Sequence, residues 1–267
     1  GGRFATITQK RRTGGIRVIS ERGRINMHID PGPGALIYSL EMGLDPQKIS
    51  AIFISHSHLD HVNDAEPLIE AMSEGTAKKR GMLVASRSVL RGNEICESSI
   101  SRYHQAMPEK VIEATIGSSF DVDGVKVTVC KAVHSDPDTV GFRFDIEGFG
   151  SFAYMPDSEY FSDVSKFYSG LRLIILSVLR PSGQPWEGHM TTDDAIRIIE
   201  NTRPEMAIIT HFGMQMILKS PEREAELIEK KTNVLTKAAF DGMRILLERE
   251  IIFGRKAEKR DLSSFFG

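Results

Sequence analysis

The chain has 267 residues, of which 40% are hydrophobic, so it is long enough to bury a large core within one domain. Its 34 basic and 36 acidic residues give a formal net charge of −2, which argues against a surface uniformly coated for nucleic acid. The sequence has no apolar stretch of eighteen or more residues, so we predict no membrane-spanning segment.

The two cysteines, Cys96 and Cys130, predict neither a disulfide framework nor a cysteine-based metal site. Cys130 lies in a strand pattern and is expected to be a small core residue. A reducing, cytoplasmic setting fits this cysteine usage, and no charged-then-apolar signal segment opens the chain.

The most informative stretch contains three histidines and an aspartate within six residues, His56, His58, Asp60 and His61. It directly follows residues 51–55, an apolar run typical of a buried strand. Four such side chains at one strand end would compete for ordinary packing partners. A divalent metal removes that conflict, because neutral imidazole and carboxylate are both good ligands for zinc and its neighbours. The stretch therefore predicts a metal site rather than a solvated, histidine-rich turn.

Three more ligand-type residues each stand just after an apolar run. They are His134 after residues 125–133, Asp157 after residues 151–156, and His211 after residues 207–210. Between the first cluster and these residues, positions 62–110 predict a helix, a short strand at 82–85 and a second helix. A single histidine of this kind is more often a core or surface residue. Three ligand-type residues, each directly after a predicted strand, predict that these side chains converge at one sheet edge.

The spacing His-x-His-x-Asp-His, followed by a His, an Asp and a His after later strands, resembles the metallo-β-lactamase superfamily. Asp30 and the loop to residue 34 resemble the early Asp-x-Gly loop of that superfamily, and residues 239–243 resemble its C-terminal strand and turn. The resemblance implies an α/β (α+β) fold, a four-layer αβ/βα sandwich, in a single domain over residues 1–267. It places the metals on one edge, between two sheets. The superfamily usually begins with a short strand before a Gly-rich loop, so we expect a few residues to precede Gly1.

The seven predicted metal ligands then divide into two sets that share one carboxylate. The first set is His56, His58, His134 and one oxygen of Asp157, and the second is Asp60, His61, His211 and the other oxygen of Asp157. Two divalent ions about 3.5–4 Å apart can share a water, lower its pKa and stabilise an oxyanion. A metal-bound hydroxide would then attack a carbonyl or a phosphorus. Nitrogen and oxygen ligands do not choose between zinc, manganese and iron. We expect zinc, with manganese and iron as alternatives.

The candidate catalytic residues are Asp60, His189 and Arg180. Thr191 is a predicted helix N-cap with Asp194 in a capping box, which places His189 just ahead of a helix N-terminus, where anions are favoured. His189 would donate to a phosphoryl or leaving-group oxygen, although a plain helix-start role stays open. Arg180 suits bidentate pairing with a phosphate, and it equally suits a surface salt bridge.

The Gly-His-x-Thr-x-x-x-Ala pattern at residues 188–195 resembles the phosphodiesterase branch of the superfamily. It is similar to ribonuclease Z, a tRNA 3′-processing endonuclease, and to phosphoribosyl cyclic phosphodiesterases. The His-Glu-Ala-Thr element of ribonuclease Z is absent at the matching strand end, residues 176–181. Its Pro-x-Lys-x-Arg-Asn element and its tRNA-gripping arm are absent too. We therefore expect a small or cyclic phosphodiester, or a nucleotide end, as the substrate.

Other functions of the same fold are weighed by what they would require. A lactone or thioester hydrolase would use the same metals but present an aromatic, apolar pocket. An oxygen-reducing di-iron protein would replace the second histidine of the cluster by glutamate, and a non-catalytic module would have lost ligands. Basic clusters at residues 10–12, 78–80 and 255–260 are expected to be solvated surface. RNA stays open as a partner because folding could gather the first two clusters beside the metals. A homodimer is compatible with the sequence.

Overall fold

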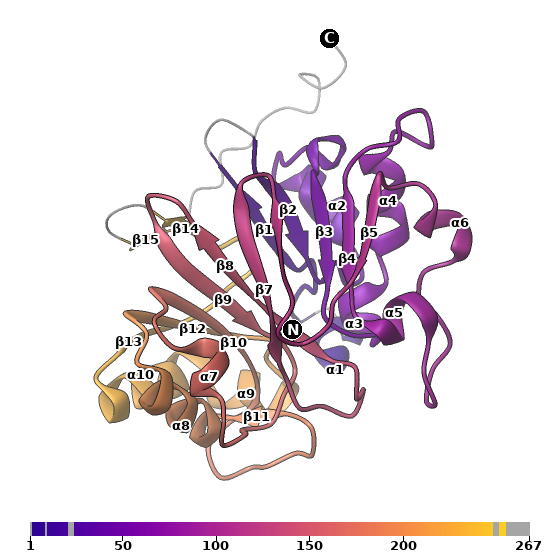
Figure 1. Ribbon diagram of the computed structural model, residues 1–267. Coiled ribbons are helices and arrows are strands. Elements are labelled where there is room, and N and C mark those ends of the chain that lie inside the picture. The colour runs from indigo at the N-terminus through magenta and orange to yellow at the C-terminus, as the bar shows by residue number, and fades with distance from the viewer. Residues whose placement is uncertain (1, 9, 21–23, 248–250, 255–267) are drawn as a thin grey trace.

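Two β-sheets face each other and helices cover the outer face of each, which makes four layers (Figure 1). The computed structural model describes residues 2–8, 10–20, 24–247 and 251–254. Gly1 and the basic cluster at residues 255–260 lie outside these residues. The predicted four-layer αβ/βα sandwich is confirmed.

The first sheet is built from the N-terminal part of the chain. In spatial order its strands are β1 (Ile16–Ile19), β2 (Asn26–Ile29), β3 (Ala51–Ile54), β4 (Met82–Ala85) and β5 (Lys110–Glu113). β1 is antiparallel to β2, and the other neighbours are parallel. The helices of this half are α2 (Ala35–Glu41), α3 (Leu59–Val62), α4 (Ala65–Met72), α5 (Arg87–Arg91) and α6 (Arg102–Gln105), with a 3₁₀ turn over Pro46–Lys48. The order α4, β4, α5 confirms the helix, strand and helix predicted for residues 62–110.

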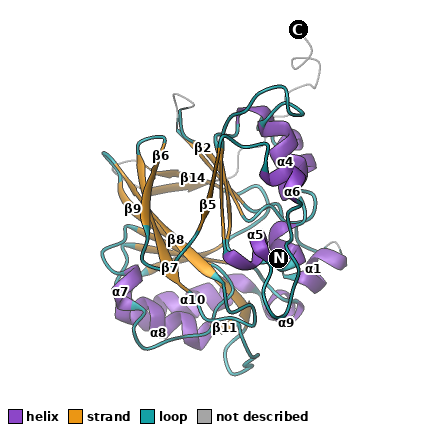
Figure 2. Ribbon diagram, turned by 45° about the vertical axis from the view of Figure 1, so that its right-hand side comes forward, coloured by secondary structure: helices purple, strands orange, loops and turns teal. Residues whose placement is uncertain are grey.

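The second sheet uses the central and C-terminal parts of the chain. In spatial order its strands are β13 (Leu235–Ala238), β12 (Met206–Thr210), β10 (Leu173–Arg180), β9 (Gly150–Met155), β8 (Val140–Ile146), β7 (Val125–Lys131) and β6 (Ser119–Val122). A short strand, β11 (Met190–Thr191), pairs with β10. The helices of this half are α7 (Ser165–Tyr168), α8 (Thr192–Thr202), α9 (Met214–Lys219) and α10 (Pro221–Thr232). Helices α7, α8 and α10 lie together on the outer side of the sheet (Figure 2).

Two elements stand outside the sheets. A short helix, α1 (Arg3–Ile7), lies near α3, and a hairpin of β14 (Arg244–Leu247) and β15 (Ile251–Gly254) follows the second sheet. The predicted C-terminal strand and turn at residues 239–243 is partly wrong, because β13 ends at Ala238 and residues 239–243 only connect it to β14.

Helix α8 shows why the local sequence forms this structure. Thr191 accepts a hydrogen bond from the backbone N–H of Asp194, whose side chain accepts from the Thr191 N–H, so the predicted capping box is confirmed. Ala195, Ile198 and Ile199 recur at helical spacing and are buried against the second sheet. This cap fixes where the helix begins, and therefore where His189 stands just before it.

Aromatic packing holds the two sheets together. The ring of Phe53 on β3 lies with its centroid 5.2 Å from the rings of both Phe142 and Phe144 on β8. Phe144 in turn stacks on Phe152 of β9 at 4.6 Å. All four side chains are almost fully buried, and each contributes roughly 1.5–3 kcal/mol of hydrophobic stabilisation. This core sets the position of one sheet edge relative to the other.

The strand directions determine where the candidate functional residues gather. β9, β10 and β12 are parallel, and β7 runs in the same direction because β8 is antiparallel to both β7 and β9. The carboxyl ends of these strands meet at one edge, and ligands of α/β proteins generally bind outside such ends. The residues that follow them therefore lie close together.

Candidate metal centre

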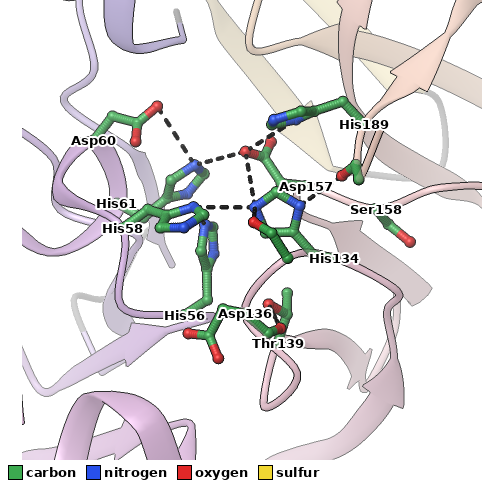
Figure 3. Close-up of polar contacts among 12 residues, drawn as sticks. His56, His58, Asp60, His61, His134, Asp136, Thr139, Asp157, Ser158 and His189 are labelled. Carbon is green, nitrogen blue, oxygen red and sulfur yellow. Dashed lines mark hydrogen bonds and ion pairs between the residues drawn. The ribbon is translucent and has the colours of Figure 1, made fainter. Parts of the chain in front are cut away.

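All seven predicted metal ligands come together in one cluster. Six of them, all except His211, are labelled in Figure 3. His56, His58, Asp60 and His61 come from the loop after β3 and from α3 in the first half. The others, His134, Asp157 and His211, follow β7, β9 and β12 of the second half. Each half of the fold therefore supplies part of the cluster.

The first set consists of His56, His58, His134 and Asp157, each with a ligand atom within 4.8 Å of those of the others. The Nδ1 atom of His58 lies 3.1 Å from Nε2 of His56 and 3.0 Å from Nε2 of His134. Zinc–nitrogen bonds of about 2.0–2.1 Å in a tetrahedron separate two nitrogens by about 3.3 Å. The imidazole spacing is thus close to that of ligands around one ion.

The second set consists of Asp60, His61 and His211. The Nε2 atoms of His61 and His211 are 3.0 Å apart, and Oδ2 of Asp60 lies 3.2 Å from Nε2 of His211. His211 has a φ of +62°, a left-handed conformation that is costly for a residue other than glycine. Such backbone strain gathers at functional sites, where the surrounding structure maintains it.

Asp157 lies between the two sets, as predicted for a shared carboxylate. Its Oδ2 atom is 3.6 Å from Nε2 of His61 and 3.9 Å from Nε2 of His134, and its Oδ1 atom is 3.1 Å from Nδ1 of His211. Buried ligand-type atoms here have no hydrogen-bond partner among the described residues: Oδ1 of Asp60, Oδ1 of Asp157 and Nδ1 of His211. Buried polar atoms normally have partners. The contacts of these atoms are ion pairs rather than hydrogen bonds, Asp157 with His211 and Asp60 with Arg3. Carboxylate oxygens that lack hydrogen bonds in one cluster fit a site for cations.

Asp30 forms a further group with His56 and His61, but its carboxylate is already fully engaged. Its oxygens accept hydrogen bonds from the backbone and hydroxyl of Ser55, from the hydroxyl of Tyr154 and from Nδ1 of His61, at 2.7–2.9 Å. Accepting from Nδ1 leaves the Nε2 atom of His61 to face the cluster. Asp30 therefore orients a candidate ligand rather than acting as one.

His134 is oriented in the same way by a backbone group. Its Nδ1 atom donates to the carbonyl oxygen of Gly188 over 2.6 Å, which turns Nε2 toward His58. Gly188 in turn donates its N–H to Oε1 of Glu159 over 2.6 Å. These contacts fix both the tautomer and the direction of the His134 ring.

Asp136 joins the loops that carry the first set. Its Oδ2 atom accepts from the backbone N–H of Ser57 at 3.0 Å and from the Ser57 hydroxyl at 2.8 Å. Ser57 lies between His56 and His58, and Asp136 is two residues after His134, so one buried carboxylate holds both loops (Figure 3).

The pKa shifts of His56, His58 and Asp157 favour the protonation states that ligate metals. His61 differs, because burial lowers its pKa but the charges of Asp157 and Asp30 outweigh burial and raise that pKa well above the ordinary value. Burial, followed by repulsion from His61, holds the pKa of His56 well below its ordinary value. Burial, followed by the charge of Arg3, lowers the pKa of His58 to about 4. Burial opposes the ionisation of Asp157, but His211 and His61 outweigh it and hold its pKa well below the ordinary value. Neutral imidazoles around an ionised carboxylate are the forms that bind metal ions.

Of the three candidate catalytic residues, Asp60 and His189 lie in the cluster. Nδ1 of His189 is 3.4 Å from Oδ2 of Asp157 and is buried without a hydrogen-bond partner among the described residues (Figure 3). Arg180 stands apart at the end of β10, where its guanidinium stacks on the ring of Trp186 at 4.6 Å.

The sequence does not predict the role of Arg3. Its Nε atom lies 3.5 Å from Oδ1 of Asp60, which adds an exposed cation at the rim of the cluster. Nothing near Arg3 in the sequence indicates this position, since α1 reaches the site only in the folded chain.

The basic cluster at residues 78–80 does not lie beside the candidate metal ligands. It precedes the amino end of β4, and the ligands follow the carboxyl ends of the strands, at the opposite edge of the sheet.

Comparison with known proteins agrees with this fold and site. A family model described as the β-lactamase superfamily domain matches residues 25–212. Over 249 residues the chain is 36% identical to an uncharacterized protein of Methanocaldococcus jannaschii, and the alignment covers 92% of each protein. The chain therefore belongs to the β-lactamase superfamily, and its fold and clustered histidines and aspartates are those of a metallo-β-lactamase-fold, metal-dependent hydrolase.

Solved structures with the same fold have lower sequence identity. The metallo-β-lactamase fold protein YhfI from Bacillus subtilis has a TM-score of 0.69 at 18% identity, covering 87% of this chain and 88% of that one. A diphosphatase of the PhnP family has a TM-score of 0.60 at 23% identity, covering 81% and 78%. The short form of human tRNase Z has a TM-score of 0.58 at 16% identity, covering 88% and 90%. No helix in the described part of the chain has the length and apolarity needed to cross a bilayer.

Proposed function

We propose that this protein is a dinuclear metal-dependent phosphodiesterase that acts on a small or cyclic phosphodiester or on a nucleotide end. One ion would be held by His56, His58, His134 and Asp157, and a second by Asp60, His61, His211 and Asp157. Zinc suits this set of nitrogen and oxygen donors, and manganese and iron are compatible with it. When bound, such a pair of ions supplies an activated water and stabilises developing negative charge.

The position of His189 is the observation that carries the phosphodiester assignment. Its buried Nδ1 atom faces Asp157 without a hydrogen-bond partner among the described residues, and its backbone leads directly into β11 and α8. A neutral imidazole N–H can donate to a phosphoryl oxygen or to a leaving-group oxygen. The N-terminus of α8 adds a partial positive charge nearby.

Two arginines also favour an anionic substrate, Arg3 at the rim of the cluster and Arg180 on the strand before the His189 loop. Arg3 lies beside Asp60, and the guanidinium of Arg180 lies over the ring of Trp186. A guanidinium can pack against an aromatic ring and still pair with a phosphate through its N–H groups. The solved structures of a PhnP-family diphosphatase and of human tRNase Z share the fold. They support a phosphate ester as the substrate class by analogy of fold.

Turnover of model substrates by metal-analysed protein tests the proposal. Bis(4-nitrophenyl) phosphate should be hydrolysed by the metal-loaded protein, with loss of activity after chelation and recovery when a divalent ion is restored. A panel of lactones and thioesters should react far more slowly. Rapid lactone or thioester hydrolysis without phosphodiester hydrolysis would overturn the proposal.

A cavity beside the second set favours a second candidate, the hydrolysis of a lactone or thioester. The cavity measures about 1090 Å³, and aromatic side chains such as Phe152, Tyr154 and Phe240 line it. Asp60, His61 and His211 lie on its wall, so an apolar acyl group placed there would reach the cluster. The same substrate panel separates the two candidates, because an acyl ester would then be the better substrate.

A further inference from the structure

Trp186 is the chain's single tryptophan, and it lies on the loop between β10 and β11 that leads to His189. Its side chain is 57% exposed. A single exposed apolar side chain needs no explanation by itself. Trp186 differs in three respects. Hydrogen bonds fix its loop, the guanidinium of Arg180 lies over its ring, and it pairs with His189, a candidate catalytic residue.

A tight turn places Trp186 next to His189. The backbone N–H of His189 donates to the carbonyl oxygen of Trp186 over 3.1 Å, and the two residues pair as opposite partners of an antiparallel bridge. Gly188, third in this turn, has a φ of +76°, which glycine adopts readily. Opposite residues of an antiparallel pair project to the same side, with Cβ atoms about 4.5–5.5 Å apart. The indole and the His189 imidazole therefore project to one side of the turn.

The loop that carries Trp186 is fixed at both ends. At its start, the backbone N–H of Ser182 donates to Oε2 of Glu224 at 3.0 Å, and that of Gly183 donates to Oδ2 of Asp193 at 2.8 Å. At its end, Gly188 is bound to Glu159 and to the candidate ligand His134. A side chain held in place before binding loses little conformational entropy when a ligand arrives.

The Arg180 guanidinium lies 4.6 Å from the centre of the Trp186 ring. This cation–π contact supports the indole from one side, while more than half of its surface stays open. Aromatic rings supported in this way are suitable surfaces for stacking another planar π-system, such as a nucleobase. The N–H edge of the same guanidinium remains available to an anion.

We propose that Trp186 is a stacking platform for the nucleobase of a nucleotide whose phosphate lies against His189 and the metal ligands. This inference rests on the proposed phosphodiesterase function and specifies its substrate class. The guanidinium of Arg180 would pack against the indole of Trp186, and its N–H groups would donate to the phosphate. A base on Trp186 and a phosphate at His189 are groups that one nucleotide carries together.

The single tryptophan allows a direct binding test. Metal-loaded protein is titrated with adenosine 5′-monophosphate, a monoester that a phosphodiesterase releases rather than cleaves, while tryptophan fluorescence is followed. We expect saturable quenching, because the base stacks on the only indole. Ribose 5-phosphate carries the phosphate without the base, so it should displace the nucleotide but cause no quenching alone.

Variants measured by calorimetry complete the test. Trp186→Leu should weaken adenosine 5′-monophosphate binding by about tenfold to a hundredfold and leave ribose 5-phosphate binding unchanged. Trp186→Phe should retain most of the affinity, and Tyr103→Leu, which removes an aromatic ring 63% exposed on α6, should have no effect. Equal affinity of wild type and Trp186→Leu for adenosine 5′-monophosphate would contradict the proposed stacking of the base on Trp186.

The failure of the platform can be told apart from the failure of the proposed function. Phosphodiester turnover without Trp186-dependent nucleotide binding would contradict the stacking role of Trp186 and leave the proposed phosphodiesterase function in place. Trp186-dependent nucleotide binding without phosphodiester turnover would support the platform and overturn the proposed hydrolysis.

Discussion

His134 and Gly188 are 54 positions apart in the sequence, and the Nδ1 atom of His134 donates to the Gly188 carbonyl oxygen over 2.6 Å. One hydrogen bond therefore connects a candidate metal ligand to the turn that bears both His189 and Trp186. Displacement of this turn would alter the orientation of the His134 ring and the position of the candidate catalytic group together.

Gly188→Ala should disturb the proposed metal centre more than an equivalent change elsewhere in the loop. A Cβ atom at Gly188 would lie 3.0 Å from Nδ1 of His134, and the φ of +76° adds backbone strain of about 1–3 kcal/mol. Gly183→Ala is the matched control, because Gly183 has a φ of +74° and open space around it. Thermal unfolding should show similar strain in both variants, whereas metal titration should show weaker binding in Gly188→Ala alone. Equal metal affinities would contradict the proposed role of this hydrogen bond.

Asp157→Ala should lower metal content and abolish turnover together, because it removes the carboxylate that faces both sets. Wild-type protein should hold about two divalent ions per chain. Asp163→Ala, which removes a partly exposed carboxylate paired with Lys131, should retain both ions and activity. Elemental analysis with parallel activity measurements checks this, and full occupancy in Asp157→Ala would disprove the assignment of Asp157 as a shared ligand.

His189→Ala should keep the metal content of wild type while kcat falls by roughly 10²–10⁴-fold, the usual range for the loss of an acid–base group. His104→Ala, on α6 and paired with Glu66, is the control and should be neutral. Loss of metal from His189→Ala would instead identify a ligand or a ligand support. An unchanged kcat would favour the reading of His189 as a helix-start residue without function.

Asp30→Ala should be far more damaging than Tyr154→Phe. Removing Asp30 leaves buried donors of Ser55, His61 and Tyr154 without their acceptor, at about 1–3 kcal/mol for each unsatisfied group. Tyr154→Phe removes one donor and leaves the others in place, so it should cost about 1 kcal/mol. Loss of the partner that orients a ligand typically lowers metal affinity 10–100-fold, which we expect for Asp30→Ala. Urea unfolding and metal titration of both variants measure these effects, and similar results for the two would refute the orienting role of Asp30.

A small phosphodiester should be a better substrate than structured tRNA. The formal net charge is −2, and a polyanionic RNA normally binds a strongly basic surface with steep salt dependence. The basic cluster at residues 78–80 also lies away from the metal centre, and Lys78 and Arg80 contact Glu74 and backbone carbonyls. Comparing kcat/KM for a cyclic phosphodiester and for precursor tRNA at two salt concentrations checks the expectation. Efficient and salt-sensitive tRNA cleavage would restore a ribonuclease Z function.

The seven residues of the two sets can be predicted from sequence because each follows an apolar run, and the strand character of such a run depends on local pattern. Their convergence also follows from a general rule about strand ends. The groups that orient them cannot be predicted in the same way. Asp136 acts on Ser57 across 79 positions, and Tyr154 acts on Asp30 across 124, so each role exists only in the folded chain.

The contribution of the loop before His189 is similarly invisible in the sequence. Arg180 can be predicted as an anion-pairing residue from its type and its place at a strand end. Its stacking on Trp186 depends on the Gly188 turn and on the contacts of Ser182 and Gly183 with acidic residues of α8 and α10. No local pattern in the loop indicates these contacts.

Because the two halves of the fold each supply ligands, metal ions bound as proposed would act as cross-links between the halves. Separating the sheets would require the ions to leave, so the free energy of unfolding would rise with the concentration of free metal. The gain is about 2.7 kcal/mol when that concentration is 100 times the dissociation constant. Metal starvation would then shorten the lifetime of the folded protein as well as stop its chemistry. Resistance to proteolysis would report the metal supply even in a variant that cannot turn over substrate, such as His189→Ala.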